Sequence, residues 1–231
     1  MFSSLFSWEG IRDLILLIPV VLFSISFHEF AHGWMAYRLG DPTPKYEGRL
    51  TLNPARHLDL VGFLMLIIVR FGWAKPVSVN PNYFKNPSRG MLVTAVSGPI
   101  ANLILAIITS FLYALLYTLI SIFGVNSEFM ALVWTYVIQI LVLFIYVNIG
   151  LAVFNLIPIH PLDGSRVLAY FMPARYHDFM ARFGQYIYIG FVILVVATPY
   201  VGDFIAFVQS GIADLLLSFW QLVFSPILSM F

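Results

Sequence analysis

The chain contains five apolar stretches that reach or approach the length needed to cross a lipid bilayer. A spanning helix needs about 20 mostly apolar residues. Only 10% of the residues are charged, against about 25% in a soluble domain, and so few charges cannot cover a water-facing surface. We therefore expect an all-α polytopic membrane protein. The stretches run from about Ile11 to Leu39, Met91 to Phe123, Glu128 to Ile157, Phe183 to Ala197 and Phe204 to Phe224.

A sixth apolar run, Leu60–Val69, is too short to be assigned as a span on its own, so the sequence predicts five to six transmembrane helices. This run could cross the bilayer or dip in and return. It lies between Gly40 and Gly90, a region that prolines and glycines interrupt repeatedly. We expect short extended segments there at Glu47–Leu52 and Trp73–Val79. Within the second, Lys75–Val79 has the period-2 spacing of an edge strand, where proline is tolerated.

Residues 1–231 are expected to form a single membrane-embedded domain, because the sequence shows no internal repeat, low-complexity tract or second soluble domain. The core would comprise about residues 11–166, with additional transmembrane helices at about 183–224. No basic run interleaved with aromatic residues indicates nucleic-acid binding. The expected surroundings are the lipid bilayer, most simply that of the cell membrane.

The basic residues fall in alternate connections between the apolar stretches. Cytoplasmic loops are enriched in lysine and arginine, so the connections near residues 40–90 and 163–182 should share the cytoplasmic side. The links at 124–127 and 198–202 contain no basic residue. The basic residues of the two cytoplasmic connections are Arg38, Lys45, Arg49, Arg56, Arg70, Lys75, Lys85, Arg89, Arg166, Arg175 and Arg182.

The first apolar stretch contains the motif His28-Glu29-Phe30-Ala31-His32. Residues i and i+4 share a helix face, so both imidazoles could bind one zinc ion while Glu29 acts as general base. The simpler reading is an ordinary polar helix face. A glutamate at such a depth costs about 2.5–3.5 kcal/mol on insertion scales, however, and intramembrane ionisable residues usually mark function. The cluster therefore favours a zinc site.

A zinc site of this kind needs a third protein ligand, and the chain contains no cysteine. Asp163 is the best candidate, because it follows an apolar span on the side to which the basic loops assign the end of the first stretch. Pro158 and Pro161 could turn its side chain inward. By spacing alone His57, His160 and the other acidic residues stay open, and Asp163-Gly164 could simply form a turn.

Together these motifs resemble the site-2 protease family of intramembrane zinc metalloproteases. That family combines H-E-x-x-H on one transmembrane helix with a later N-x-x-P-x-x-x-x-D-G motif, here Asn155-Leu-Ile-Pro158…Asp163-Gly164. The segment Ser97–Asn102 is also family-like. The similarity extends from about Phe27 to Arg166. Many members carry a PDZ or CBS domain, for which this chain has no room, and His160 stands where relatives usually have an apolar residue or proline.

The resemblance implies roles for individual residues. His28, His32 and Asp163 would bind zinc, and Glu29 would be the catalytic base. Asn155 would hydrogen-bond near the scissile peptide or the oxyanion, with Asn102 as a further candidate for the substrate cavity or for interhelical packing. A membrane-associated strand would receive the unwound substrate, and its substrate-facing positions here would be Lys75, Val77 and Val79.

The leading hypothesis is an intramembrane zinc endopeptidase that cuts transmembrane proteins near the cytoplasmic face, as in regulated intramembrane proteolysis. The rival is a metal-ion transporter or channel that uses the same histidine and aspartate cluster as an ion path. A transporter should show inverted repeats or further polar residues across the membrane. The sequence shows no repeat, and the last two apolar stretches contain few polar residues.

Overall fold

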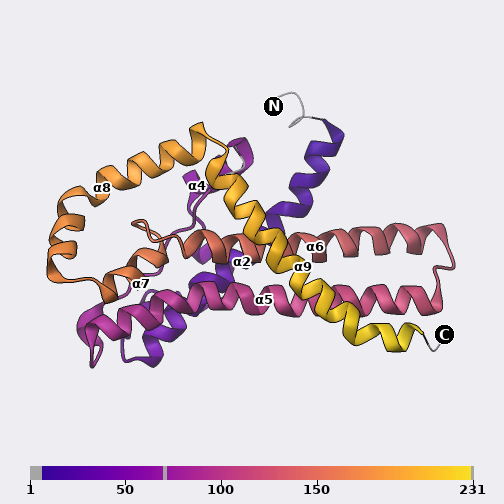
Figure 1. Cartoon of the computed structure of the whole chain (residues 1–231), viewed down its shortest axis with the longest axis horizontal. Coiled ribbons are helices and arrows are strands. Elements are labelled where there is room, and N and C mark those ends of the chain that lie inside the picture. The colour runs from indigo at the N-terminus through magenta and orange to yellow at the C-terminus, as the bar shows by residue number, and fades with distance from the viewer. Residues whose placement is uncertain (1–6, 70–71, 230–231) are drawn as a thin grey trace.

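The computed structural model describes residues 7–69 and 72–229, and within them five helices are long and apolar enough to span a membrane. This agrees with the all-α polytopic fold expected from the sequence. Figure 1 shows α5 and α6 side by side, with α9 crossing them obliquely and α2 packed near their middle. The spanning helices are α2 (Trp8–Arg38), α5 (Pro87–Phe123), α6 (Glu128–Asn155), α8 (Ala174–Ala197) and α9 (Tyr200–Leu228).

Side-chain caps explain where three of these helices begin. Each is preceded by a serine or asparagine whose side chain accepts a hydrogen bond from an otherwise unpaired amide of the first turn. Ser7 caps α2, Asn86 caps α5 and Ser127 caps α6. Gly124 follows α5 with a φ of 69°, a left-handed conformation that glycine adopts without steric cost.

The shorter helices lie in the connections. Two helices, the short α7 and the spanning α8, differ from the sequence expectation. α7 (Asp163–Phe171) was not anticipated, because its residues are too polar to read as a span. α8 begins at Ala174 rather than near Phe183, because its first turns contain arginines that no apolar pattern would include. The remaining short helices are α3 (Thr43–Tyr46), η1 (Pro54–Arg56), α4 (Leu60–Val69) and η2 (Pro81–Tyr83).

The sixth apolar run forms α4, whose two flanks lie side by side. Leu58 pairs with Ala74 in a single antiparallel bridge, and the Lys75 amide donates to the His57 carbonyl at 2.8 Å. Gly62 makes this approach possible, since a Cβ there would lie 2.2 Å from the Trp73 carbonyl oxygen. The segments before and after α4 are therefore held next to each other, and α4 projects from them.

The expected extended segments do not form strands in the described part of the chain. Residues 47–52 form turns and bends, so the prediction of an extended segment at Glu47–Leu52 was wrong. In Trp73–Val79 only Ala74 forms a β-bridge with another segment, the isolated bridge to Leu58. The other residues of this segment have no regular secondary structure. The prolines and glycines correctly indicated that the described residues of this region form no long helix. A strand also needs a neighbouring strand to pair with, and these residues do not provide one.

A buried carboxylate fixes the end of the segment that follows Trp73. Asp41 is fully buried, and its two oxygens accept from the Thr43 amide at 3.0 Å and the Asn80 amide at 2.7 Å. Hydrogen bonds to a charged acceptor contribute more than neutral ones. Asp41 therefore ties the connection after α2 to residue 80.

Replacing Asp41 by alanine should release this tie. Leaving these amides unpaired should destabilise the local structure by about 1–3 kcal/mol. Hydrogen exchange in detergent should then be faster at the hydrogen-bonded amides of Val77 and Asn80, while Glu47→Ala, an exposed carboxylate in the same connection, should leave it unchanged. Equal exchange in both variants would contradict the role given to Asp41.

Candidate metal centre

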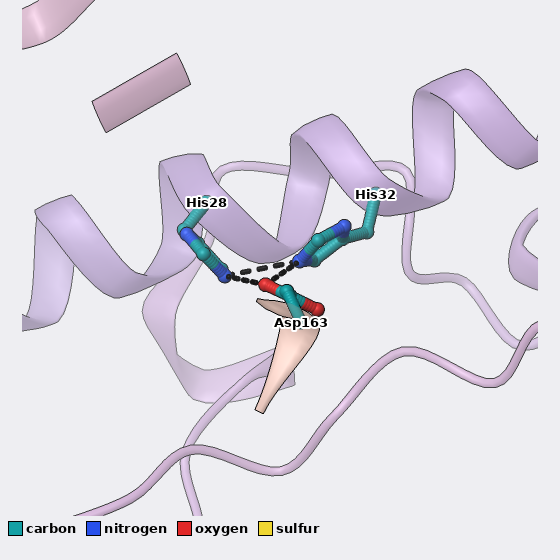
Figure 2. Close-up of side chains that lie close together, drawn as sticks. All are labelled: His28, His32 and Asp163. Carbon is teal, nitrogen blue, oxygen red and sulfur yellow. Dashed lines mark hydrogen bonds and ion pairs between the residues drawn. The ribbon is translucent and has the colours of Figure 1, made fainter. Parts of the chain in front are cut away.

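Three side chains from two helices converge on one point. His28 and His32 lie one turn apart on α2, and Asp163 is the first residue of α7 (Figure 2). Asp163 Oδ2 lies 3.2 Å from His28 Nε2 and 3.0 Å from His32 Nε2, and the two Nε2 atoms are 3.0 Å apart. Their exposed fractions are 6%, 6% and 8%. The chain thus builds a compact, buried cluster from residues far apart in sequence.

The outer nitrogen of each imidazole is held by a hydrogen-bond acceptor. His32 Nδ1 lies 2.8 Å from the carbonyl oxygen of Thr94. A carbonyl only accepts, so His32 Nδ1 must carry the proton. His28 Nδ1 lies 2.6 Å from Asn102 Oδ1. If His28 Nδ1 likewise donates to Asn102 Oδ1, both neutral histidines present unprotonated Nε2 atoms to the cluster.

The orientation of Asn102 follows from a chain of contacts that ends at a backbone carbonyl. The Asn148 amide nitrogen donates to the Phe144 carbonyl at 2.8 Å and to Ser24 Oγ at 2.9 Å, so Asn148 Oδ1 is an acceptor. Asn102 Nδ2 donates to it at 2.7 Å and also approaches the Ser24 carbonyl at 3.4 Å. Asn102 Oδ1 is left to accept from His28 Nδ1. The helices α2, α5 and α6 together set the tautomer of His28.

This protonation pattern leaves acceptors facing one another. Burial by itself raises the pKa of the Asp163 carboxyl, whereas Nε2 protons on the two imidazoles would donate to Asp163 and hold that pKa well below the ordinary value. With both Nε2 atoms unprotonated, a carboxylate oxygen and two imidazole lone pairs meet about 3 Å apart. Such an arrangement is repulsive unless a cation or extra protons occupy its centre. Its geometry therefore favours a bound metal ion.

The donor set fits zinc in both chemistry and spacing. Two imidazoles and one carboxylate are the ligands of many catalytic zinc sites, which keep a fourth position for water. Zinc bonds of about 2.0–2.2 Å in a tetrahedral arrangement separate ligand atoms by about 3.3 Å. The three ligand atoms here are 3.0–3.2 Å apart. Small outward shifts would suffice to admit the ion.

Two glycines allow the helices to come this close. A Cβ at Gly98 of α5 would lie 2.4 Å from His32 Nε2 and 2.6 Å from His28 Cε1. A Cβ at Gly164 would lie 2.2 Å from the Leu156 carbonyl oxygen. Gly98 therefore packs its backbone against the imidazoles, and Gly164 lets the start of α7 pack against the end of α6.

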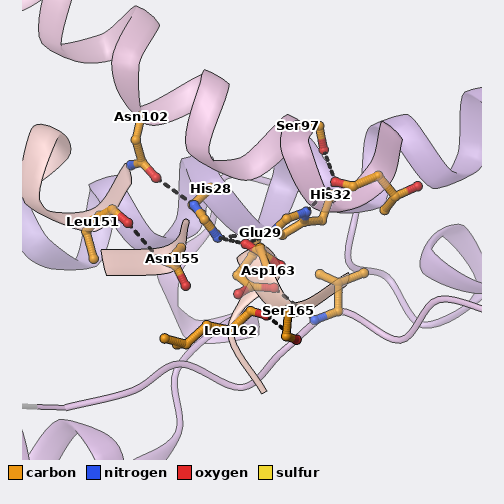
Figure 3. Close-up of polar contacts among 12 residues, drawn as sticks. His28, Glu29, His32, Ser97, Asn102, Leu151, Asn155, Leu162, Asp163 and Ser165 are labelled. Atoms are coloured by element: carbon orange, nitrogen blue, oxygen red, sulfur yellow. Dashed lines mark hydrogen bonds and ion pairs between the residues drawn. The ribbon is translucent and has the colours of Figure 1, made fainter. Parts of the chain in front are cut away.

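Glu29 lies beside the cluster and contacts the segment after Trp73. Figure 3 shows Glu29 beside His28 and Asp163. Glu29 Oε2 accepts a hydrogen bond from the Val77 amide at 2.9 Å, and no other described residue forms a hydrogen bond with this carboxylate. Val77 is buried, whereas Lys75 is exposed. The segment predicted to receive substrate thus lies against the predicted base through Val77.

The other candidate residues take different positions. Asn155 ends α6 near the cluster, but its amide donates to the Leu151 carbonyl of its own helix at 2.9 Å (Figure 3). Asn102 was considered for the substrate cavity, yet its polar atoms are all engaged by His28, Asn148 and Ser24. His57 bonds the Thr51 carbonyl, and His160 is exposed. Neither histidine belongs to the cluster of described residues that could hold a metal.

Sequence reasoning missed Asn148 and Ser24, which orient Asn102. A buried asparagine within an apolar span is itself a signal, because such a group needs a partner in the membrane. Spacing alone could not identify that partner, since the residues lie on different helices.

Comparisons with known proteins agree with this geometry. The model of peptidase family M50 matches residues 16–197. The chain is 36% identical over 213 residues to "Putative zinc metalloprotease YwhC" of Bacillus subtilis (strain 168), covering 92% of this chain and 94% of that protein. It is 28% identical over 200 residues to "Putative zinc metalloprotease Rip2" of Mycolicibacterium smegmatis, covering 82% and 68%. No solved structure matches the chain significantly.

Replacing Asn102 by leucine should weaken metal binding without removing a ligand. The substitution keeps the side-chain size but leaves His28 Nδ1 without its acceptor, and loss of such a partner typically costs 10–100-fold in metal affinity. Competition with a zinc chelator would measure the change. Thr109→Val is the matched control, because Thr109 is also buried on α5 but bonds only carbonyls of its own helix. A zinc affinity equal to wild type would refute this role.

Replacing Gly98 by alanine should displace the imidazoles, because the added Cβ overlaps His32 Nε2. We expect zinc content, measured by elemental analysis of the purified protein, to fall to a small fraction of the wild-type value. Gly190→Ala on α8 serves as the control, since a Cβ there meets open space. Full zinc occupancy in the Gly98 variant would show that the approach of α5 is not required.

Proposed function

The chain belongs to peptidase family M50 and is a multi-pass membrane zinc metalloprotease, and we propose that it is an intramembrane endopeptidase that hydrolyses transmembrane proteins. The observation that carries the proposal is the buried cluster of His28, His32 and Asp163 next to Glu29, on a helix apolar enough to span the bilayer. A transporter or channel is not favoured, because the family and its named relatives are metalloproteases.

His28, His32 and Asp163 would hold the zinc ion. When bound, zinc would act as a Lewis acid and lower the pKa of water to near neutral pH. Glu29 would accept the proton and later return it to the leaving amine. Its Oε2 is oriented by the Val77 amide, which leaves Oε1 for proton transfer. Asn102 and Thr94 would keep both imidazoles in the ligating tautomer.

The segment 75–79 would bind the substrate backbone. In the described structure the amides of Ser78 and Val79 have no hydrogen-bond partner, nor do the carbonyls of residues 75–79. A helical peptide bond in lipid is closed off by its own hydrogen bonds, so a substrate must unwind before attack. Once extended, it could pair with these free groups by strand addition. Lys75, Val77 and Val79 would line this path, and Asn155 would approach the scissile carbonyl.

The site would face the cytoplasmic side. The C-terminal ends of α2 and α6, the N-terminal end of α5 and the short α7 meet at one end of the structure (Figure 1). The connections at that end contain most of the lysines and arginines, as expected for cytoplasmic loops. Cleavage would therefore occur near the cytoplasmic end of a substrate span.

Replacing Glu29 by glutamine should separate metal binding from catalysis. Zinc content should stay at the wild-type level, because Glu29 is not among the three proposed ligands. Cleavage of a panel of labelled single-span peptides in detergent should fall by about 10²–10⁴-fold, the usual contribution of a general base. Gel analysis of the peptides and elemental analysis of the protein would measure both.

Asp163→Ala provides the contrast, since it should lose zinc and cleavage together. Undiminished cleavage by Glu29→Gln would refute the proposed mechanism. If wild-type protein that contains zinc cut none of the peptides in the panel, the proposal of transmembrane substrates would be wrong.

A further inference from the structure

Asp214 is a charged side chain at the centre of a spanning helix, and it is exposed. It lies midway along α9 (Tyr200–Leu228). Its neighbour Ala213 is fully buried in a cluster with Ala106, Ile145 and Ile149. Ala106 lies near the middle of α5 (Pro87–Phe123) and Asp214 lies midway along α9, so Asp214 lies near mid-depth of the bilayer.

The two faces of α9 differ sharply. The inner face is fastened to α5 and α6, where Trp220 Nε1 donates to Ser110 Oγ at 2.9 Å and Gln209 donates to the Tyr146 carbonyl. Asp214 lies on the outer face, with Gly211 and Ser218 one turn before and after it. Leu222 and Leu215 on this side are 73% and 70% exposed. A Cβ added to Gly211 would meet nothing within 4 Å.

No described residue bonds or neutralises the Asp214 carboxylate. The lysines and arginines of the spanning helices all lie within about three turns of a helix end, at Arg12, Arg38, Arg89, Arg175 and Arg182. A carboxylate at mid-bilayer depth is costly, and such residues are almost always paired. The partner of Asp214 must therefore come from outside the described chain.

We propose that the outer face of α9, formed by Gly211, Asp214, Ser218 and Leu222, binds a transmembrane helix of another protein that carries a lysine or arginine at mid-bilayer depth. Small residues such as Gly211 and Ser218 allow two helix backbones to approach closely in a membrane. A basic side chain opposite Asp214 would supply the missing charge. This inference does not depend on the chemistry of the metal centre.

A second copy of this chain fits the same surface less well. A symmetric pair would bring another Asp214 carboxylate to the first, and two adjacent carboxylates cannot both ionise without strong repulsion. The described spans offer no cation at that depth. A basic partner helix meets the charge requirement directly.

Model transmembrane peptides test the proposal in phosphatidylcholine vesicles that contain the full-length protein. The peptides are leucine–alanine helices with lysine, leucine or aspartate at the central position. Because the chain has no cysteine, Ser229→Cys provides one labelling site for energy transfer. The lysine peptide should bind the wild type more tightly than the leucine peptide does. Asp214→Leu should weaken lysine-peptide binding about five- to thirty-fold.

Further variants distinguish charge pairing from a loss of folding. Asp214→Lys should bind the aspartate peptide, which wild type should not. Asp203→Leu, at the first turn of α9, should bind as wild type does, and zinc content should be equal in all variants. Equal binding of the lysine and leucine peptides would overturn the proposal. So would self-association of labelled protein that depends on Asp214, because the partner would then be a second copy.

Discussion

The proposed metal centre depends on the supply of hydrogen-bond partners to groups that the bilayer cannot solvate. His28 and His32 can direct their Nε2 lone pairs inward only because Asn102 and Thr94 accept at their outer nitrogens. Asn102 is in turn oriented by Asn148, which is anchored on the Phe144 carbonyl. In water, solvent could replace any of these partners. In hydrocarbon each partner must come from the protein. The hydrogen bonds that orient the His28 imidazole therefore connect three helices, α2, α5 and α6.

Much of this could be predicted from the sequence, because its strongest signals are local. The length of the apolar stretches identified the five spanning helices, and the spacing of His28 and His32 placed both on one helix face. The motif around Asp163 indicated that it comes near the histidines, and the structure places it there. The first two depend on length or spacing within one segment, whereas the expectation for Asp163 came from the resemblance of two motifs far apart in the sequence to a known family.

The features that could not be predicted involve contacts between segments. The backbone approach at Gly98 becomes visible only once α5 lies against α2. The edge strand at Trp73–Val79 failed as a prediction of regular structure, because alternation within a segment does not provide a neighbouring strand. Helix α7 was missed because its residues are too few and too polar to resemble a membrane span.

The closure of the chain around α4 has a consequence for how this protein can vary. Leu58 and Ala74 are paired, and the Lys75 amide is bonded to the His57 carbonyl, so both ends of the excursion are fixed at one point. Residues inserted or deleted within α4 would change how far the excursion extends without moving Val77 relative to Glu29. We therefore expect a change in the length of the excursion to leave the residues on either side of it in place.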